Sequence, residues 1–387
     1  MKRKDLLKLL GAFILAAIMA LAFVPGCAAP EPVPGPAGPA GPSGPSGAPA
    51  PSPAPAPAPT LKDMLDGLSV STYGMGGNSF AETAGYTEAI FKTFGARIRA
   101  VPGESDAERI WPLRTGEVAF TNLSAAVMYT CQQGIGELFS KWGPSKVRAV
   151  WKLDTVHEVW ASPADTTIKT LADMKGKRYA MRKGYAMQEL DRDVWLTYAN
   201  LTPDDIEEVY FSSNQDMRFS IARHQADMVA LSTGSDFQEI YATAGFKVIP
   251  MPDITEADHE AWERVHKISS YFMPHTWDGT HGCVGATPEN PYYGWGYPEG
   301  FYCFDDAPDD LVYAFCEALD ETYGLAVDIC PGNWESSLKD QTKDFWWGGF
   351  PLHSGTIKYL KDKGVWPSEW DELQQKELAV EAERMAD

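Results

Sequence analysis

The stretch LSVSTYGMGGNSFAETAGYTEAIFKTFG, Leu68 to Gly95, decides the fold class. Alternating apolar and polar residues up to Tyr73 predict a β-strand, and the apolar spacing after the glycines predicts an amphipathic helix. A strand, a glycine turn and a helix in this order begin an α/β unit. Free N–H groups at such a helix start attract anions, carboxylates included. We therefore expect ligand contacts from Tyr73, Gly76, Gly77, Asn78 and Ser79; the alternative is a turn that only connects the two elements.

The rest of the chain repeats this alternation of strands and helices, which predicts a largely parallel sheet in each of two lobes. The run from Val147 to Ser162 is longer than a typical strand and is suited to passing from one lobe to the next. Residues 275–306 hold many aromatic and turn-forming residues and predict a long ordered loop region. Two helices are expected after it, around Leu311–Tyr323 and Asp371–Met385.

The N-terminus has the pattern of an export signal. Lys2, Arg3 and Lys4 precede a 16-residue apolar run, Leu9 to Val24, which is too short for an ordinary membrane span of roughly 20 residues. A small residue followed by Cys27 resembles the lipobox of bacterial lipoproteins, in which the cysteine is acylated and becomes the new N-terminus. We expect residues 1–26 to be a lipoprotein signal peptide and Cys27 to carry lipid. A plain signal peptide and an uncleaved anchor are the alternatives, and all three export the domain.

Residues 27–60 are dominated by Pro, Ala, Gly and Ser, with glycine at every third position from Gly35 to Gly47. The spacing is collagen-like, but four or five triplets are too few to hold a trimer, so we interpret the segment as a stiff spacer. Extended polyproline chain rises about 3.1 Å per residue, which gives the segment a reach on the order of 100 Å.

The charge of the mature chain excludes one class of partner. The 26 residues of the signal contain four of the 33 basic and one of the 53 acidic residues, so the remaining chain has a formal charge of −23. Such a surface repels phosphate backbones, and we expect no nucleic-acid partner. Five cysteines follow Cys27, and pairs such as Cys316–Cys330 or Cys283–Cys303 are compatible with an exported protein; Cys131 is the fifth.

Catalytic and cofactor signatures are missing from the sequence. It contains no GxSxG, no GxxxxGK[ST], no HExxH and no CxxC. We therefore expect neither a catalytic set nor a metal or other cofactor. Asp309 and Asp310 follow Pro308 at an expected helix start, where carboxylates favour the exposed N–H groups.

A second candidate ligand position follows the expected strand KRYAM, Lys177 to Met181. In open α/β sheets, ligands lie outside the carboxyl ends of the strands. Arg182 stands at that end, and an arginine can hold a carboxylate with two parallel hydrogen bonds. Because the chain is strongly acidic, a cation here indicates an anionic ligand; a solvated surface charge is the alternative.

Four passages in this order resemble one family, the TAXI-type solute receptors of tripartite ATP-independent periplasmic (TRAP) transporters. They are VSTYGMGGNSF (70–80), VHEVWASPADTTIKTLADMKGKRYAMRKG (156–184), SIARHQADMVALSTG (220–234) and FPLHSGTIKYLKDKGVW (350–366). VPGES (101–105) and GYAMQ (184–188) depart from the family's pattern at expected ligand loops, so the resemblance does not identify the solute.

The resemblance implies a two-lobed periplasmic-binding-protein (Venus-flytrap) α/β architecture with a ligand cleft between the lobes. We expect lobe 1 to comprise 61–155 together with about 251–300, lobe 2 to comprise 156–250, and 301–387 to be distributed over both lobes. By position, the expected ligand residues beyond the first turn are Ser105, Ser124, Arg182, Tyr185, Ser232, Thr233, Gly234 and Trp277, with Trp277 and Trp295 as a roof over the cleft.

The expected function is that of an extracytoplasmic receptor, lipid-anchored at the outer face of the cell membrane. It captures a small, carboxylate-bearing organic solute and delivers it to an ion-gradient-driven TRAP permease. Two other classes remain open: an exported enzyme on a similar two-lobed scaffold, which would convert its ligand, and a surface lipoprotein without a transport role, which would bind none.

Overall fold

The computed structural model describes residues 59–75, 78–182, 185–232, 235–268, 272–279, 284–330, 336–342 and 349–386. Pro57–Asp387 forms one compact unit. The expected signal peptide, Cys27 and nearly all of the spacer lie outside the described residues, as do four expected ligand residues, Gly76, Gly77, Thr233 and Gly234. Within the described residues, no helix is both long and apolar enough to span a membrane.

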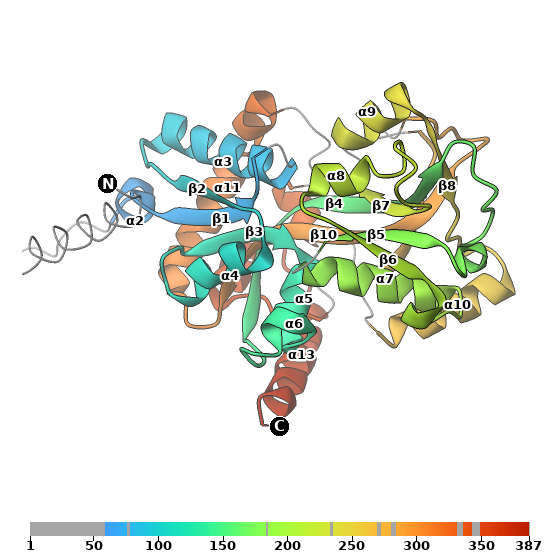
Figure 1. Cartoon of the computed structure of the whole chain (residues 1–387). Coiled ribbons are helices and arrows are strands. Elements are labelled where there is room, and N and C mark those ends of the chain that lie inside the picture. Colours follow the sequence, from blue (N-terminus) through green and yellow to red (C-terminus); the bar gives the residue numbers. More distant parts are fainter. Residues whose placement is uncertain are drawn as a thin grey trace, which may run out of the picture. The chain divides into compact units, whose positions relative to one another are not determined.

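A mixed eight-stranded sheet runs through both lobes of this unit (Figure 1). Its main path is β2-β1-β3-β10-β4-β7, with β8 paired to β4 and β9 paired to β10. The strands are β1 (Ser69–Tyr73), β2 (Arg99–Gly103), β3 (Phe120–Ser124), β4 (Val147–Pro163), β7 (Val229–Ser232), β8 (Phe246–Ile249), β9 (Met273–Trp277) and β10 (Tyr292–Phe304). β1 is parallel to β2 and β3, whereas β10 and β4 are antiparallel to their neighbours.

The two long strands, β4 and β10, join the lobes. β4 confirms the expected long strand, and it pairs with β10 from Val147 to Glu158. One half of this pair lies beside β3 in the first lobe, and the other half lies beside β7, β8 and β9 in the second. Residues 154–157 of β4 are only partly buried, although both ends of the strand are fully buried. The exposed segment therefore marks the opening between the lobes.

The first lobe is completed by eight helices of the described chain, several of which begin at side-chain caps. Ser105 and Ser124 accept hydrogen bonds from Glu108 N and Val127 N at the starts of α4 and α5. α3 packs against α11, and α11 packs against α12. The helices are α2 (Leu61–Leu65), α3 (Asn78–Phe94), α4 (Asp106–Arg114), α5 (Ala125–Gln133), α6 (Gly136–Phe139), α11 (Asp309–Ile329), α12 (Ser354–Asp362) and α13 (Trp370–Arg384).

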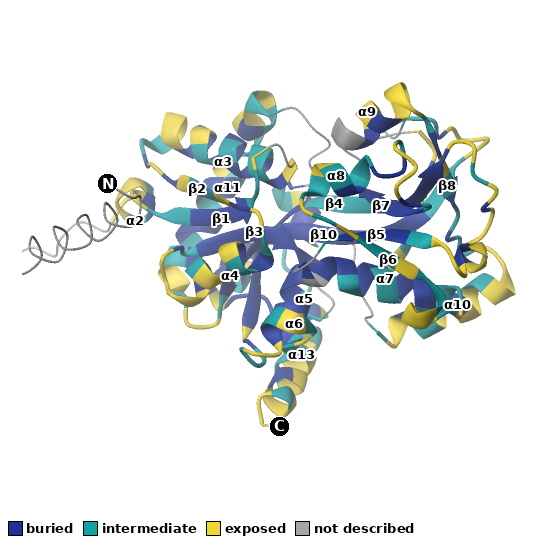
Figure 2. Cartoon of the chain, viewed as in Figure 1, coloured by how far each residue is buried: buried dark blue, intermediate teal, exposed yellow. Residues whose placement is uncertain are grey.

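The second lobe adds a parallel pair of strands, β5 (Arg178–Arg182) and β6 (Glu207–Phe211). A bridge between Tyr179 and Met228 connects this pair to the chain entering β7. Its helices are α7 (Ala186–Tyr198), α8 (Asn214–Arg218), α9 (Ser235–Thr243) and α10 (Glu256–His266). Figure 2 shows the central strands of both lobes buried beneath helices whose outer faces are exposed.

The expectation of a loop throughout 275–306 is wrong, because half of this segment forms β9 and β10. Gly294 and Gly300 are places of close backbone approach within the sheet, rather than turns. A Cβ atom at Gly294 would lie 2.1 Å from Glu158 O, and one at Gly300 would lie 2.5 Å from Trp151 O. The aromatic residues between them have high strand propensity and lie in the core.

Two expected lobe boundaries are also corrected. The described part of 251–298 packs with the second lobe, since α10 packs against α7, and β9 pairs with the second-lobe half of β10. The described part of 301–387 packs in the first lobe, where α11 contacts α3 and Arg148 forms a buried two-pronged ion pair with Glu381 of α13. Cys303, Cys316 and Cys330 are free thiols, so neither considered disulfide is formed; Cys131 is also free.

Candidate functional site

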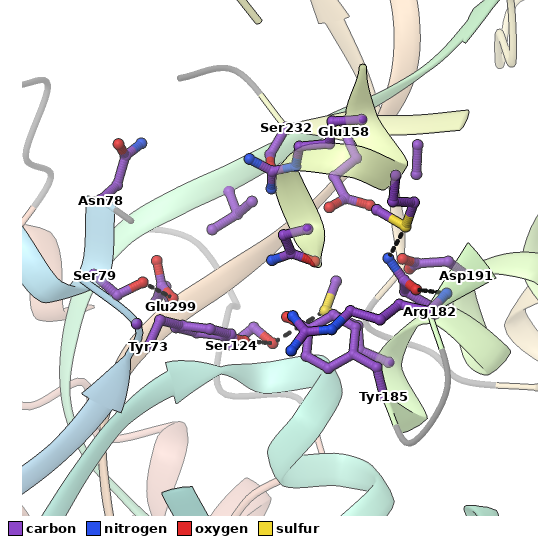
Figure 3. Close-up of a pocket in the computed structure, with 18 of the residues that line it drawn as sticks. Tyr73, Asn78, Ser79, Ser124, Glu158, Arg182, Tyr185, Asp191, Ser232 and Glu299 are labelled. Atoms are coloured by element: carbon purple, nitrogen blue, oxygen red, sulfur yellow. Dashed lines mark hydrogen bonds between the residues drawn. The ribbon is translucent and has the colours of Figure 1, made fainter. Parts of the chain in front are cut away.

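A cavity of about 450 Å³ lies between the lobes (Figure 3). Its lining includes the last residue of four strands, two from each lobe: Tyr73 of β1, Ser124 of β3, Arg182 of β5 and Ser232 of β7. The carboxyl ends of strands are where ligands bind in open α/β sheets. The volume is within the range of small-molecule pockets, roughly 300–1,000 Å³. The cavity is therefore the candidate ligand site.

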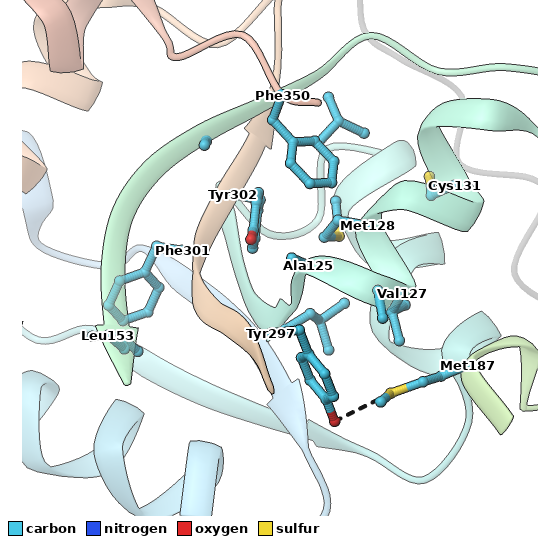
Figure 4. Packing of buried hydrophobic residues seen from close by; sticks show 14 of the residues in the cluster. Ala125, Val127, Met128, Cys131, Leu153, Met187, Tyr297, Phe301, Tyr302 and Phe350 are labelled. Carbon is cyan, nitrogen blue, oxygen red and sulfur yellow. Dashed lines mark hydrogen bonds between the residues drawn. The ribbon is translucent and has the colours of Figure 1, made fainter. Parts of the chain in front are cut away.

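The floor of the cavity consists of β4 and β10, the strands that join the lobes. On β4 the floor is formed by Asp154, Thr155, Val156 and Glu158, and on β10 by Tyr297 and Glu299. The Tyr297 hydroxyl donates to Glu158 Oε1 at 3.1 Å and lies 3.6 Å from the Met187 sulfur. Figure 4 shows Tyr297 and Met187 beside buried residues of α5, so the floor rests on the packed core.

The first-lobe wall places hydroxyl groups and one buried arginine at the cavity. The Tyr73 hydroxyl donates to Ser124 Oγ at 3.1 Å, and Ser79 Oγ donates to Glu299 Oε1 at 2.5 Å. Arg109 of α4 is 1% exposed and forms a 2.5 Å ion pair with Asp106. Its guanidinium also packs over the Tyr73 ring, 4.2 Å from the centroid.

The second-lobe wall contributes two further arginines. Arg182 reaches across to the first lobe, where its Nη2 donates to the carbonyl oxygen of Glu104 at 2.5 Å. Its guanidinium lies 5.7 Å from the centroid of the Tyr185 ring. Arg218 of α8 donates from Nη2 to Ser232 Oγ at 2.7 Å. An arginine thus lies at the carboxyl end of each second-lobe strand that ends at the cavity, Arg182 at β5 and Arg218 at β7.

A buried acid pair, Glu82 and Glu299, lies at the first-lobe side of the cavity. Glu82 is 4% exposed and Glu299 is 3% exposed. Burial, together with the charges of Glu299 and Asp154, raises the pKa of Glu82 well above its usual range. Burial raises the pKa of Glu299 to about 7, although the Ser79 hydroxyl and Arg109 favour its ionised form. Burial therefore favours the protonated form of both carboxyl groups.

A second acid pair, Glu158 and Asp191, lies at the other side. Burial raises the pKa of both, and the Glu158 carboxyl raises that of Asp191 further. Arg218 acts in the opposite direction on Glu158. Glu158 Oε2 and Asp191 Oδ1 are buried without a hydrogen-bond partner, so both oxygens have unused hydrogen-bonding capacity.

The Glu299 carboxyl predicts a pH dependence of stability. Its ordinary pKa is 4.5, and its pKa in the folded protein is about 7. Between these values the native state keeps a proton that the unfolded chain has lost, so the free energy of unfolding falls as pH rises through this window. Glu299→Gln retains an acceptor for Ser79 and is expected to flatten the slope, leaving the variant more stable than wild type by about 3 kcal/mol at pH 8.

Urea denaturation of both proteins between pH 4.5 and 8 measures this difference. Glu383→Gln, which removes an exposed carboxylate from α13, is the matched control for loss of one charge. If the profiles of wild type and Glu299→Gln run parallel over the whole range, the assignment of the titrating group is wrong.

Of the residues expected from the sequence, seven lie in the cavity lining, and their roles in binding stay predictions: Tyr73, Asn78, Ser79, Ser124, Arg182, Tyr185 and Ser232. Ser105 does not line the cavity, because its hydroxyl caps α4. The expected aromatic roof is wrong. Trp277 is 2% exposed within the second-lobe core, and Trp295 is fully buried and stacks on Trp160.

The sequence interpretation missed the charged residues that dominate the cavity: Glu82, Arg109, Asp154, Glu158, Asp191, Arg218 and Glu299. Glu158 and Glu299 had a usable signal, since each is a lone acid within an apolar, aromatic run, VHEVWA and GYPEGFY. Four of the others, Glu82, Arg109, Asp191 and Arg218, stand on helices, where an acid or arginine is ordinarily solvated, and Asp154 lies in the partly buried middle of β4. Among the described residues, no group of three or more His, Cys, Asp or Glu is arranged to hold a metal ion.

A comparison with protein-family models matches residues 71–364 to the NMT1-like family. The chain belongs to the NMT1-like family. The matched residues of this NMT1-like protein run from within β1 to just beyond α12 and thus span both lobes and the whole cavity lining. None of the curated proteins compared with the chain matches it.

Solved structures with a similar chain path come from several solute-binding proteins. The alkanesulfonate-binding protein SsuA from Xanthomonas axonopodis pv. citri, bound to MOPS, is 15% identical with a TM-score of 0.41, covering 81% of this chain and 83% of its own. The aliphatic sulphonate binding protein SsuA from Escherichia coli is also 15% identical, with a TM-score of 0.41 and coverages of 82% and 87%. An ancestral arginine-binding protein bound to arginine is 14% identical, with a TM-score of 0.41 and coverages of 68% and 98%.

Proposed function

We propose that this NMT1-like protein is an extracytoplasmic receptor that binds a small carboxylate-bearing solute between its lobes and delivers it to a membrane permease. One observation carries the proposal. The cavity is enclosed by strand ends of both lobes, and its floor is formed by the two strands that connect them. A ligand there contacts both lobes at once, so it favours whichever lobe arrangement brings those contacts together.

The arginines support a carboxylate as the bound group. Arg182 and Arg218 reach the cavity from the second lobe, and Arg109 reaches it from the first. A guanidinium presents two parallel N–H donors, which match the two oxygens of a carboxylate. Arg182 already contacts a first-lobe carbonyl. A solute bound at Arg182 would therefore lie beside a hydrogen bond that already connects the two lobes.

The proposals of a permease partner and of a lipid anchor rest on the sequence. The four passages that resemble TAXI-type receptors support a TRAP permease as the partner. Acylation of Cys27 would keep the receptor at the membrane, and the spacer of residues 27–60 would let it reach the permease. Intact-mass measurement of the mature protein checks the acylation, since an unmodified N-terminus at any other residue excludes it.

A thermal-shift screen tests the receptor function. The purified domain from Thr60 onward is titrated with mono- and dicarboxylates, amino acids and neutral sugars. At least one carboxylate is expected to raise the melting temperature in a concentration-dependent way, because a ligand that binds only the native state stabilises it. Mass spectrometry then compares the solute before and after incubation. Recovery of a converted product supports the enzyme alternative, and no shift from any compound supports a surface protein without a transport role.

A further inference from the structure

We propose that the solute also carries a cationic group, such as an ammonium, and that Glu82 and Glu299 hold it at the first-lobe side of the cavity. This inference rests on the receptor function proposed above and names the chemical class of its solute: a zwitterion, with a carboxylate toward the arginines and a cation toward this acid pair.

The acid pair is a built site with an unused acceptor. Glu82 projects from the first turns of α3 and is 4% exposed, yet its Oε2 has no hydrogen-bond partner. Glu299 Oε1 accepts the Ser79 hydroxyl, which fixes the orientation of that carboxyl group. A buried acceptor without a donor is an unmet hydrogen-bonding capacity, so a donor supplied by the solute would satisfy it.

The charges around this pair leave room for a cation. The basic side chain that acts on Glu299 is Arg109. Arg109, however, is paired with Asp106 and donates to Gly103 O. The charged neighbours that act on Glu82 are both acids, Glu299 and Asp154. A positive group placed among these carboxyls is attracted by all of them.

The whole lining has the same excess of acid. It contains six carboxyl groups but three guanidinium groups: Glu82, Glu104, Asp154, Glu158, Asp191 and Glu299, against Arg109, Arg182 and Arg218. Burial raises the pKa of four of these carboxyl groups, and a cationic group of the solute would stabilise their ionised form, which a solute with carboxylates alone would not do. In Figure 3, Ser79 and Glu299 lie at one side of the cavity, and Arg182, Glu158 and Asp191 lie at the other. A zwitterion that spans the cavity matches both sides.

Proton release follows from this arrangement. A bound cation favours the ionised carboxylate, so it lowers the raised pKa values of the pair and expels protons into solvent. Affinity for such a solute is therefore expected to increase with pH between about 5.5 and 7.5. The titratable and charged groups that interact with Glu299 are Tyr73 of β1, Glu82 of α3, Arg109 of α4 and Tyr302 of β10, and Asp154 of β4 interacts with Glu82.

The test uses matched pairs of probes, the α-amino acids and the α-hydroxy acids with the same side chains, in calorimetric titrations of the intact domain. An amino acid is expected to bind about tenfold or more tightly than its hydroxy counterpart. Glu82→Gln is expected to remove most of this ratio, and Glu88→Gln, an exposed position on the same helix, is expected to keep it. Titrations in buffers with different ionisation enthalpies should report protons released by the amino acid alone.

Each result has a defined meaning. Hydroxy or dicarboxylic acids that bind as tightly as the amino acids would overturn the cationic subsite while leaving the receptor function standing. The cationic subsite is likewise overturned if Glu82→Gln, folded by circular dichroism, keeps the full amino-acid preference. Failure of every zwitterionic, anionic and neutral probe to bind would overturn the receptor function itself.

Discussion

Arg182→Ala is expected to weaken binding of the carboxylate solute by about 2–5 kcal/mol, mostly through faster dissociation. Truncation leaves a carboxylate in a cavity with six acidic side chains, and it also removes the bond to Glu104 O that crosses between the lobes. Arg182→Lys should recover only part of the loss, since an ammonium cannot form two parallel bonds with one carboxylate.

Calorimetry with the best acid from the thermal-shift screen measures this effect. Lys247→Ala removes an exposed cation from the same lobe, outside the cavity, and controls for the change in net charge. The contrary result is that the Arg182→Ala variant binds within about threefold of wild type, roughly 0.7 kcal/mol. That result would mean that another arginine holds the carboxylate or that the solute has no carboxylate.

Trp160→Ala is expected to lower the free energy of unfolding by about 3–5 kcal/mol. Trp160 is fully buried on the second-lobe half of β4 and stacks against Trp295, with ring centroids 6.2 Å apart. It also contacts Trp195 of α7, at 6.4 Å between centroids, and its Nε1 donates to the Met251 sulfur. Truncation opens a cavity where both long strands meet the helix.

Urea denaturation followed by far-ultraviolet circular dichroism measures this loss. Trp111→Ala is the matched control, because Trp111 is 49% exposed and should cost far less. Equal losses in the two variants would show that the tryptophan cluster does not contribute to holding the second lobe on the long strands.

The parts of the fold that sequence predicted are local. The strand before the glycine turn, the helix after it and the long strand β4 each follow from the pattern of a single segment. β10 was missed because Gly294, Pro298 and Gly300 are ordinary turn formers, and only the neighbouring strand shows that they serve close packing. The segment expected in the first lobe, about 251–300, packs mostly with the second lobe because of long-range strand pairing, which no local sequence pattern predicts.

The candidate site divides in the same way. Residues at the ends of strands were found by a rule about α/β sheets, and Tyr73, Ser124, Arg182 and Ser232 do lie in the cavity lining. The acid pairs were missed because their members meet only in the folded chain. Ser79 and Glu299, which form a hydrogen bond there, are 220 residues apart in sequence. Neither the burial nor the raised pKa of such carboxyls is visible before folding.

A crystal structure of the domain grown with the best acid from the screen tests the central claim most directly. We predict density for the solute between the lobes, above β4 and β10, with its carboxylate on the guanidinium of Arg182. Density for the solute at any other place on the domain, or in the cavity with its carboxylate away from all three arginines, would contradict the account.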